Sequence, residues 1–310
     1  MAFKDSLESI WAASNVHYYN ALQSLKALAG VNTTTTTTES LAKLESQIGW
    51  PDLPEQPIMV TSNFKLDLPA FLCITFALSL IPIAYFLGDR IITGRFNQRN
   101  RYLFMWHAYD ALTHLTIEAS FLYHCFFSYT SISPSHNRGP IFLKQKDRAY
   151  GATYSRGPFA RLWQEYAKAD HRWGGADSTI ISIELLTVLL GGPAAVYICW
   201  LIYKVTITPI PPSTRGLLRG RLWMLSVVLA TAELYGGFMT FVPEWLTGSP
   251  ALNTSSVVYW FLYLFFFNFT WVLFPAWVLW QAYKEIKASF SRSETGGGSS
   301  SGSPHNKKSR

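Results

Sequence analysis

Five long apolar segments constrain what this chain can fold into more than any other feature. An α-helix needs roughly 20 consecutive apolar residues to cross a bilayer. Segments of this kind run over about 68–87, 102–129, 178–203, 222–242 and 257–283. Only 15% of the residues are charged, whereas a soluble domain of this size carries about a quarter. The sequence therefore predicts an all-α membrane protein whose core, residues 67–288, is a bundle of five transmembrane helices.

Polar regions flank this predicted bundle on both sides. Residues 1–66 combine a stretch with helical periodicity and the Thr-rich run NTTTTTTES, which is typical of a flexible linker. They contain no apolar run of the kind that a signal peptide needs, so we expect no such peptide. Residues 289–310, SFSRSETGGGSSSGSPHNKKSR, are predicted to form a disordered basic tail. The three cysteines fall in three different apolar segments, and we expect them to pack in the core rather than to form disulfides.

The distribution of positive residues predicts the orientation of the chain. The short loops 88–101 and 204–221 each contain four arginines or lysines, and the loop 243–256 contains none. Positive residues favour the cytosolic side of short loops, whereas long loops such as 130–176 cross the membrane largely regardless of charge. We therefore expect a lumenal N-terminus and a cytosolic C-terminus. The last four residues, KKSR, resemble a dilysine retrieval signal and indicate the endoplasmic reticulum membrane.

Four acidic residues lie inside the apolar segments, where charge is costly: Asp110, Glu118, Glu184 and Glu233. An ionised acid at a helix centre costs roughly 2.5–3.5 kcal/mol. We expect these acids to face one another across the bundle interior, with some of them protonated. A protonated acid in an apolar pocket can donate a proton, and a neighbouring carboxylate that His114 keeps ionised can accept one. The sequence thus predicts general acid–base chemistry.

Other polar residues accompany these acids. At 100° per residue, four residues of the second segment fall within about 80° of one helical face: His107, Asp110, His114 and Glu118. The third segment adds Thr187, the fourth adds Tyr235, and the fifth adds Asn268 and Trp271. Polar side chains in membrane helices also serve as hydrogen bonds between helices, and that alternative stays open for Thr187, Tyr235 and Asn268.

Several other classes of function are disfavoured. His107, His114 and Glu118 could hold a metal on one helical face, but the remaining histidines are scattered, mostly over loops and tails, so we expect no metal. No glycine-rich phosphate loop and no Gly-x-Ser-x-Gly motif occurs. The net charge of +7 is not arranged as a basic patch with interleaved aromatic residues, so we expect no nucleic-acid binding.

Five short motifs occur in the order and spacing of a known family. They are HLTIE in the second segment, LWQEYAKADHRW before the third, IELLT with the following GGP in the third, ELYGGFMTFVPE in the fourth and FFNFTWVLFPA in the fifth. Over about residues 68–285 the chain resembles the emopamil-binding protein family, the sterol Δ8–Δ7 isomerases of the EXPERA group. The most specific parts are LWQEYAKAD and the Asn-x-x-Trp of the last segment.

The resemblance implies an EXPERA-type five-helix bundle in the endoplasmic reticulum, with a pocket open towards the membrane for a flat lipid. It implies protonation of a ring alkene, a carbocation and removal of a different proton, with no cofactor. The catalytic residues would be His114, Glu118, Glu184, Thr187, Asn268 and Trp271. We expect Asp110, Glu233, Tyr235 and Asp177 to contact the lipid substrate, and Asp170 and Asp177 match acidic positions of the family. Whether the protein is a monomer or a homodimer is left open.

The chain also departs from the family pattern. Ala119 and Ser120 replace a Gly-Trp pair, and residues 235–237 read Tyr-Gly-Gly instead of Tyr-Gly-Asp. Asp110 and Glu233 are acids where the family has uncharged residues, and the loop before the third segment carries an insertion. A terpene cyclase that protonates an olefin or epoxide of another isoprenoid is therefore an alternative. A non-catalytic lipid-binding protein is the second alternative, although such a protein has no need of two buried acids.

Overall fold

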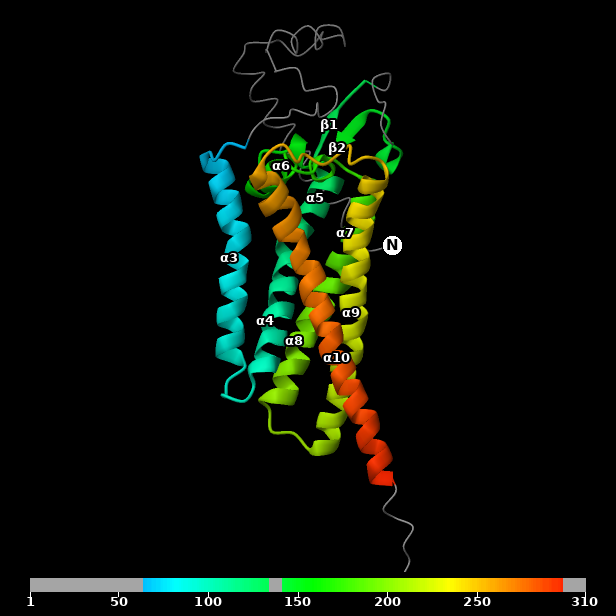
Figure 1. Ribbon diagram of the computed structural model, residues 1–310. Coiled ribbons are helices and arrows are strands. Elements are labelled where there is room, and N and C mark those ends of the chain that lie inside the picture. Colours follow the sequence, from blue (N-terminus) through cyan, green and yellow to red (C-terminus); the bar gives the residue numbers. More distant parts are fainter. Residues whose placement is uncertain (1–63, 134–140, 298–310) are drawn as a thin grey trace, which may run out of the picture. The chain divides into compact units, whose positions relative to one another are not determined.

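The computed structural model describes residues 64–133 and 141–297, with side chains up to residue 292. The predicted N-terminal region 1–66 lies almost wholly outside the described residues, as does the part of the predicted tail that follows residue 297. The described part is helical apart from one short pair of strands, β1 and β2, and several loops (Figure 1).

Four helices of the described part are long and apolar enough to cross a membrane. They are α3 (Leu68–Ile91), the unit formed by α7 (Ser178–Leu186), η5 (Thr187–Gly191) and α8 (Gly192–Thr206), then α9 (Pro212–Leu246), and finally η6 (Val258–Phe266) with most of α10 (Phe267–Gly297). The prediction of an all-α membrane protein is confirmed by these four helices, whereas the predicted number of five transmembrane helices is not. Each helix extends beyond the predicted apolar segment, because the prediction ended each segment where the apolar residues end. The helical backbone hydrogen bonds continue into the polar residues that follow.

The second predicted segment also forms one unbroken helix. It consists of α4 (Gln98–Leu112), η1 (Thr113–Glu118) and α5 (Ala119–Phe127). It is not among the four helices above, because its polar residues lower its hydropathy. Fifteen of its residues are buried in the described part, and they include His107, Asp110 and His114. These three polar residues of the helix therefore face the interior of the bundle and not the surrounding solvent.

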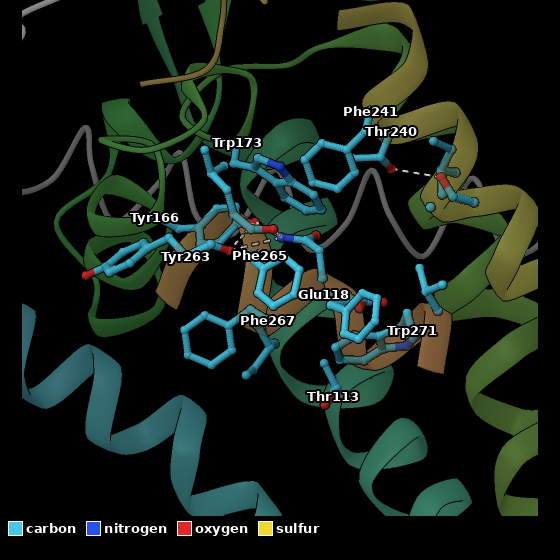
Figure 2. A pocket seen from close by; sticks show the side chains of 18 of the residues that line it. Thr113, Glu118, Tyr166, Trp173, Thr240, Phe241, Tyr263, Phe265, Phe267 and Trp271 are labelled. Atoms are coloured by element: carbon cyan, nitrogen blue, oxygen red, sulfur yellow. Dashed lines mark hydrogen bonds between the residues drawn. The ribbon is translucent and has the colours of Figure 1, made fainter. Parts of the chain in front are cut away.

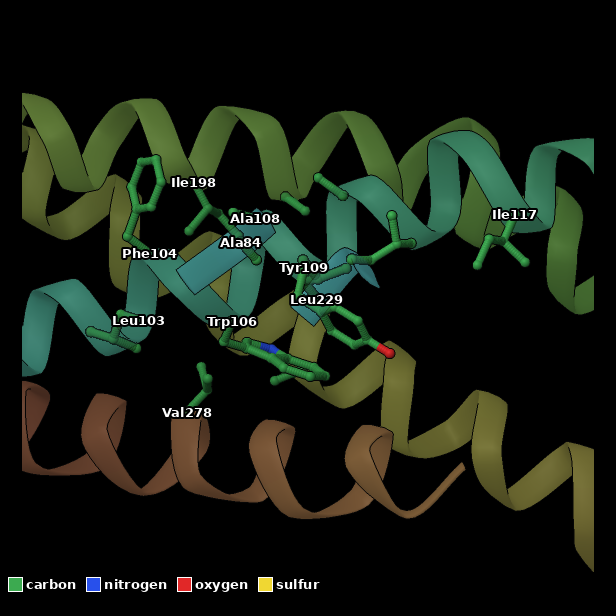
Figure 3. Close-up of a cluster of buried hydrophobic side chains, with 14 of the residues drawn as sticks. Ala84, Leu103, Phe104, Trp106, Ala108, Tyr109, Ile117, Ile198, Leu229 and Val278 are labelled. Atoms are coloured by element: carbon green, nitrogen blue, oxygen red, sulfur yellow. The ribbon is translucent and has the colours of Figure 1, made fainter. Parts of the chain in front are cut away.

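Contacts among the helices place this polar helix in the middle. α4 packs against α3 on one side and α8 on the other, and α9 packs against α8 and α10. Figure 3 shows the buried layer at this level, in which Trp106 and Tyr109 of α4 lie among side chains of the neighbouring helices. Small side chains allow the close approach: Ala84 of α3, Ala108 of α4 and Ala195 of α8 are all buried. The core thus surrounds α4 and η1 on several sides.

The predicted polar loop between the second and third segments is a folded unit, which we call the cap (129–133 and 141–177). Strand β1 (Tyr129–Ser131) pairs antiparallel with β2 (Arg148–Tyr150). Short helical turns η2 (Phe142–Lys144), η3 (Ala152–Tyr154) and η4 (His171–Trp173) and the amphipathic helix α6 (Pro158–Tyr166) complete it. Figure 1 shows the cap at the same end of the helices as the loop that follows α9.

Arg172 anchors the cap to the end of α9. Its guanidinium donates to both carboxylate oxygens of Asp170, at 2.9 and 2.6 Å, and to the carbonyl of Thr240 at 2.8 Å. The Asp170 carboxylate is fully buried, so this planar two-point contact is of the stronger kind. An isolated bridge between Asp170 and Leu252 ties the cap to the loop after α9 as well. The cap is therefore held in a fixed position over the helix ends.

The predicted start of the disordered tail at residue 289 is wrong by several residues. α10 continues to Gly297, because the sequence from Lys284 to Thr295 contains no glycine or proline that would end a helix. The first glycine run begins at Gly296 and coincides with the end of the helix.

Candidate active site

A large cavity lies between the cap and the helices. Its volume is about 660 Å³, and most of its walls are apolar or aromatic. Residues from α3, η1, α6, α7, α9, η6 and α10 line it, and Figure 2 shows Glu118 and Trp271 among aromatic side chains such as Tyr263 and Phe265. Of the six residues predicted to be catalytic, all line this cavity: His114, Glu118, Glu184, Thr187, Asn268 and Trp271.

Three of the helices change to π-helical geometry at the level of this cavity. The segments are η1, η5 and η6. His114 and Glu118 lie inside η1, and Thr187 is the first residue of η5. Glu184 lies three residues before η5, and Asn268 and Trp271 lie two and five residues after η6. A π-helical turn contains an extra residue, so it turns the side chains that follow and widens the helix. Such segments are rare and occur frequently at functional sites. Here they rotate polar side chains into a common space.

His114 stands at the centre of the polar groups. Its Nδ1 contacts Oε2 of Glu118, and its Nε2 lies 2.9 Å from Oδ1 of Asp110. Both His114 and Asp110 are almost completely buried, whereas Glu118 is partly open to the cavity. An imidazole between two carboxylates can lose a proton on one side and gain one on the other. The spacing of i and i+4 in both pairs explains why the sequence pattern could predict these contacts.

Glu184 faces the same space from α7. Its Oε2 accepts a hydrogen bond of 3.0 Å from the Thr187 hydroxyl, and its carboxyl group lies next to that of Glu118. Gly192 allows the third helix to approach η1 closely. A Cβ at Gly192 would lie 2.9 Å from Cγ of Leu115 and 3.3 Å from Cβ of His114. The GGP motif therefore sets the distance between the two helices that carry the acids.

Asn268 lines the cavity, but the donor groups of its side chain are bound to other residues of the protein. Its side-chain amide donates to the Tyr166 hydroxyl at 2.9 Å and to the carbonyls of Tyr263 and Leu264 at 3.0 and 2.9 Å. Those two carbonyls belong to η6, where π-helical geometry changes the usual backbone bonding. Asn268 thus stabilises this segment and fixes Tyr166 at the cavity wall.

Trp271 lines the cavity from α10. Its Nε1 donates to Oδ1 of Asp110 at 3.1 Å, and its ring packs against Tyr109 and Trp106 with centroid distances of 5.5 and 5.9 Å. The His114 ring lies 6.4 Å away. The hydrogen bond to Asp110 and the ring contacts hold the indole in one orientation, beside the acidic groups.

One group of side chains in the described part has the spacing of metal ligands. Asp110, His114 and Glu233 each offer an atom, and these atoms lie within 4.8 Å of one another. This set differs from the predicted alternative of His107, His114 and Glu118. In the structure Asp110 Oδ1 already accepts from Trp271 and lies against His114, so a metal would have to replace both contacts. The chemistry of this donor set fits proton sharing better than metal ligation.

Three of the four residues predicted to contact substrate do not line the cavity: Asp110, which is fully buried, Tyr235 and Asp177. Tyr235 is 63% exposed on the outer surface of α9 and does not line the cavity, whereas its neighbour Leu234 does. Successive residues of a helix point about 100° apart, so Tyr235 turns away from the cavity wall. Asp177 is the N-cap of α7, where its Oδ1 accepts from the backbone N–H groups of Thr179 and Ile180 at 2.9 Å. His107 is fully buried beneath Asp110 and does not line the cavity either. Glu233 does line it.

Asp177→Ala should therefore reduce stability and leave substrate affinity unchanged. Removal of an N-cap side chain costs about 1 kcal/mol. We expect a lower thermal midpoint with an unaltered KM, and recovery of the midpoint in Asp177→Ser, which restores a cap. A raised KM in Asp177→Ala without a loss of stability would return Asp177 to the substrate site.

The sequence pattern missed part of the cavity wall. α6 and η4 of the cap contribute Trp163, Tyr166 and Trp173. Trp163 and Trp173 stack with a centroid distance of 4.9 Å, and burial raises the pKa of the Tyr166 phenol well above its usual value, so Tyr166 stays a neutral O–H. The signal was present, since Leu162, Trp163 and Tyr166 have helical spacing within a stretch that otherwise resembles a loop.

Comparison with known proteins places these residues in a family context. The profile of the family described as EBP, EXPERA (EXPanded EBP superfamily), matches residues 158–282, which run from α6 to α10. A probable 3-beta-hydroxysteroid-Delta(8),Delta(7)-isomerase of Arabidopsis thaliana is 25% identical over 232 residues, which cover 72% of this chain and 86% of the plant protein.

Two further relatives differ in their names. The 3-beta-hydroxysteroid-Delta(8),Delta(7)-isomerase of Cavia porcellus is 24% identical over 212 residues, 67% of this chain and 75% of the animal protein. The protoglabretal synthase of Ailanthus altissima is 24% identical over 205 residues, 65% of this chain and 76% of the synthase. These three matches thus cover 65% to 72% of this chain, and they include relatives named as isomerases and one named as a synthase.

Proposed function

Because this chain belongs to the EBP family of the EXPERA superfamily, we propose that it is a membrane isomerase of a sterol or a related isoprenoid lipid. It shifts a C=C double bond by protonation, formation of a carbocation and deprotonation. The observation that carries this proposal is the group formed by His114, Glu118 and Glu184 at the wall of a largely apolar cavity. Relatives named as Delta(8),Delta(7)-isomerases support the same reaction.

The site has what this reaction requires. An alkene is a very weak base, so its protonation needs an acid that is shielded from water, and Glu118 and Glu184 lie side by side in such surroundings. The carbocation needs negative charge and a polarisable surface, which the carboxylates and the face of Trp271 provide. The reaction is redox-neutral, so the residues of the chain suffice for every proton transfer in it.

The position of the cavity supports a lipid substrate. Some of its lining residues are also exposed on the outer surface of the helices, among them Phe238, Trp245, Trp260 and Phe269. In a bilayer this surface faces acyl chains. A flat apolar molecule can therefore pass between α9 and the helix of η6 and α10 directly from the membrane.

A terpene cyclase of the same fold is the second candidate. The relative named protoglabretal synthase shows that similar chains carry names other than isomerase. Asp110 and Glu233 add buried acidity to this chain, and an acid of this kind can open an epoxide as well as protonate an alkene. The protonation step is common to both reactions, and only the fate of the cation differs.

One experiment tests the proposal and separates the candidates. The chain is expressed in microsomes and incubated in D₂O with a Δ8-sterol or with a prenylated epoxide. An isomerase is expected to give a Δ7-sterol with deuterium at the newly saturated carbon. A cyclase is expected to give a ring-closed alcohol from the epoxide, with deuterium only on the exchangeable hydroxyl. Binding of both lipids without conversion of either would show a lipid-binding protein.

We further propose that the helix 98–127 spans the membrane as the fifth helix, in the endoplasmic reticulum, with the C-terminus cytosolic. Arg99 and Arg101 lie at the end where α3 meets α4, and the loop between α8 and α9 lies at the same end (Figure 1). Protease added to sealed microsomes should remove the C-terminal tail, and glycosylation at the Asn32 sequon should mark a lumenal N-terminus. Asn253 is buried and should remain unmodified. Protection of the tail from protease would reverse the orientation.

A further inference from the structure

A second pair of carboxyl groups lies on the opposite side of His114 from Glu118. One oxygen each of Asp110 and Glu233 and a nitrogen of His114 lie within 4.8 Å of one another. Asp110 is 0% and Glu233 is 4% exposed. Among the described residues, the Glu233 oxygens and Oδ2 of Asp110 have no hydrogen-bond partners except one another. Two buried carboxyl groups that bond only to each other are costly, so stability does not explain this pair.

His114 connects this pair to the first pair of acids. Its two ring nitrogens contact Glu118 on one side and Asp110 on the other. Glu118 and Glu233 both line the cavity, from η1 and from α9, whereas Asp110 does not. Two carboxyl groups thus reach the substrate space from different helices, and a buried aspartate and a buried imidazole link them behind the cavity wall.

On the basis of the proposed isomerase function, we propose that Glu118 gives the substrate its new proton and Glu233 takes the proton that the substrate loses. Asp110 and His114 then carry a proton from Glu233 back to Glu118. Asp110 is a positioning and relay residue in this scheme, because it has no contact with the cavity. Glu184 is less suited to accept the second proton, since it lies next to Glu118 and already binds the Thr187 hydroxyl.

The scheme balances in protons and electrons. The O–H bond of Glu118 breaks and a C–H bond forms at one alkene carbon. A C–H bond then breaks at another carbon that is bonded to the cationic carbon. Its electron pair becomes the new π bond, and the proton binds Glu233. The proton then passes to Asp110 and to Nε2 of His114, while Nδ1 of His114 returns a proton to Glu118. No oxidant, reductant or further reactant takes part.

Glu233→Gln tests the acceptor. Glutamine keeps the shape of the side chain but cannot take up a proton. With a Δ8-sterol, turnover should fall by about 10²-fold, as for other general acid–base groups. Deuterium at C7, the carbon that loses its hydrogen, should slow the variant more than the wild type, because proton loss becomes rate-limiting. Turnover within twofold of wild type, or an unchanged isotope effect of C7 deuterium, would refute the assignment.

Asp110→Asn tests the return path. The amide oxygen of asparagine can still accept from Trp271, so the indole keeps its support. The first turnover should proceed at nearly the wild-type rate, because Glu118 starts with its proton, and only later turnovers should slow. An equal loss in the first and later turnovers would make Asp110 a structural residue. Loss of wild-type turnover upon metal chelation would also overturn the relay, because the same three groups would then be ligands.

Two controls keep the inference separate from the proposed function. Ser226→Ala removes another buried polar atom from α9, and we expect unchanged turnover and stability. Glu118→Gln measures the proposed function itself. An inactive Glu118→Gln beside a fully active Glu233→Gln would refute the relay alone, whereas full activity in both would refute the isomerase chemistry as well. Thermal midpoints and binding of an uncharged, unreactive saturated analogue establish that each variant is folded.

Discussion

Glu118→Gln and Glu184→Gln are each expected to lower turnover by at least about 10²-fold, the usual contribution of a general acid or base. Glutamine retains the size and most of the polarity of glutamate, so the cavity and its walls should persist. Substrate binding should change little, because the apolar walls supply most of the contact. Turnover is measured in microsomes with a Δ8-sterol, and binding is measured separately with an unreactive saturated analogue.

A matched control comes from another buried carboxyl group. Glu244 lies near the end of α9, outside the cavity, and accepts a hydrogen bond from the backbone of Ala251 at 3.0 Å. Glu244→Gln retains an acceptor oxygen there, so turnover should remain near that of the wild type. Full activity in both Glu118→Gln and Glu184→Gln would show that neither residue acts as an acid or base in the reaction.

His114→Ala should lower turnover to a similar extent, because it removes the group that contacts both Glu118 and Asp110. His124 provides the comparison. It is buried one helical segment further along, in α5, where its Nδ1 lies 2.8 Å from the Ser128 hydroxyl and its ring packs against Tyr123, with no acidic partner among the described residues. A loss of turnover specific to His114 would tie the effect to its two carboxylates.

Sequence patterns could predict the part of the site that depends on local spacing. Asp110, His114 and Glu118 are separated by four residues each, and Thr187 follows Glu184 by three. Helical geometry brings such residues together whatever the tertiary fold. The cost of charge in apolar helices then predicts that acids from different helices meet. In the structure Glu118 lies next to Glu184, and Asp110 lies next to Glu233.

The rest of the site depends on depth along the helices and on the tertiary arrangement, which helical periodicity does not contain. A wheel of 100° per residue places His107 on the same face as His114, yet His107 lies two turns, roughly 10 Å, further along the helix axis, and only His114 reaches the cavity. The prediction that both Glu233 and Tyr235 contact the substrate was wrong for Tyr235, because the wheel places these two residues about 200° apart, and one is buried while the other is exposed. The aromatic wall from the cap was missed because its helix α6 has only nine residues.

Lipophilic amines are expected to bind clearly tighter than uncharged analogues of the same shape. A pocket that stabilises a carbocation is complementary to a positive centre surrounded by apolar surface. An amine that is protonated at neutral pH mimics that centre, and it can lie between the carboxyl groups of Glu118 and Glu184 and against the ring of Trp271. A protein adapted to neutral lipids has no reason for such a preference. Equal affinity for both ligands, measured in detergent at one pH, would count strongly against carbocation chemistry.

Trp271→Leu separates the charge effect from simple packing. A cation over a desolvated indole gains about 2 kcal/mol, which corresponds to roughly 30-fold in Kd. Both ligands lose similar contact area in the variant, so only the amine should lose this additional factor. Trp245→Leu is the matched control, because Trp245 also lines the cavity but lies at its exposed outer edge, far along α9 from Glu233. There the amine and its neutral analogue should weaken to the same extent, since no cation forms at that position. The ratio of the two Kd values, compared between the two variants, thus locates the positive charge of the reaction at the face of Trp271.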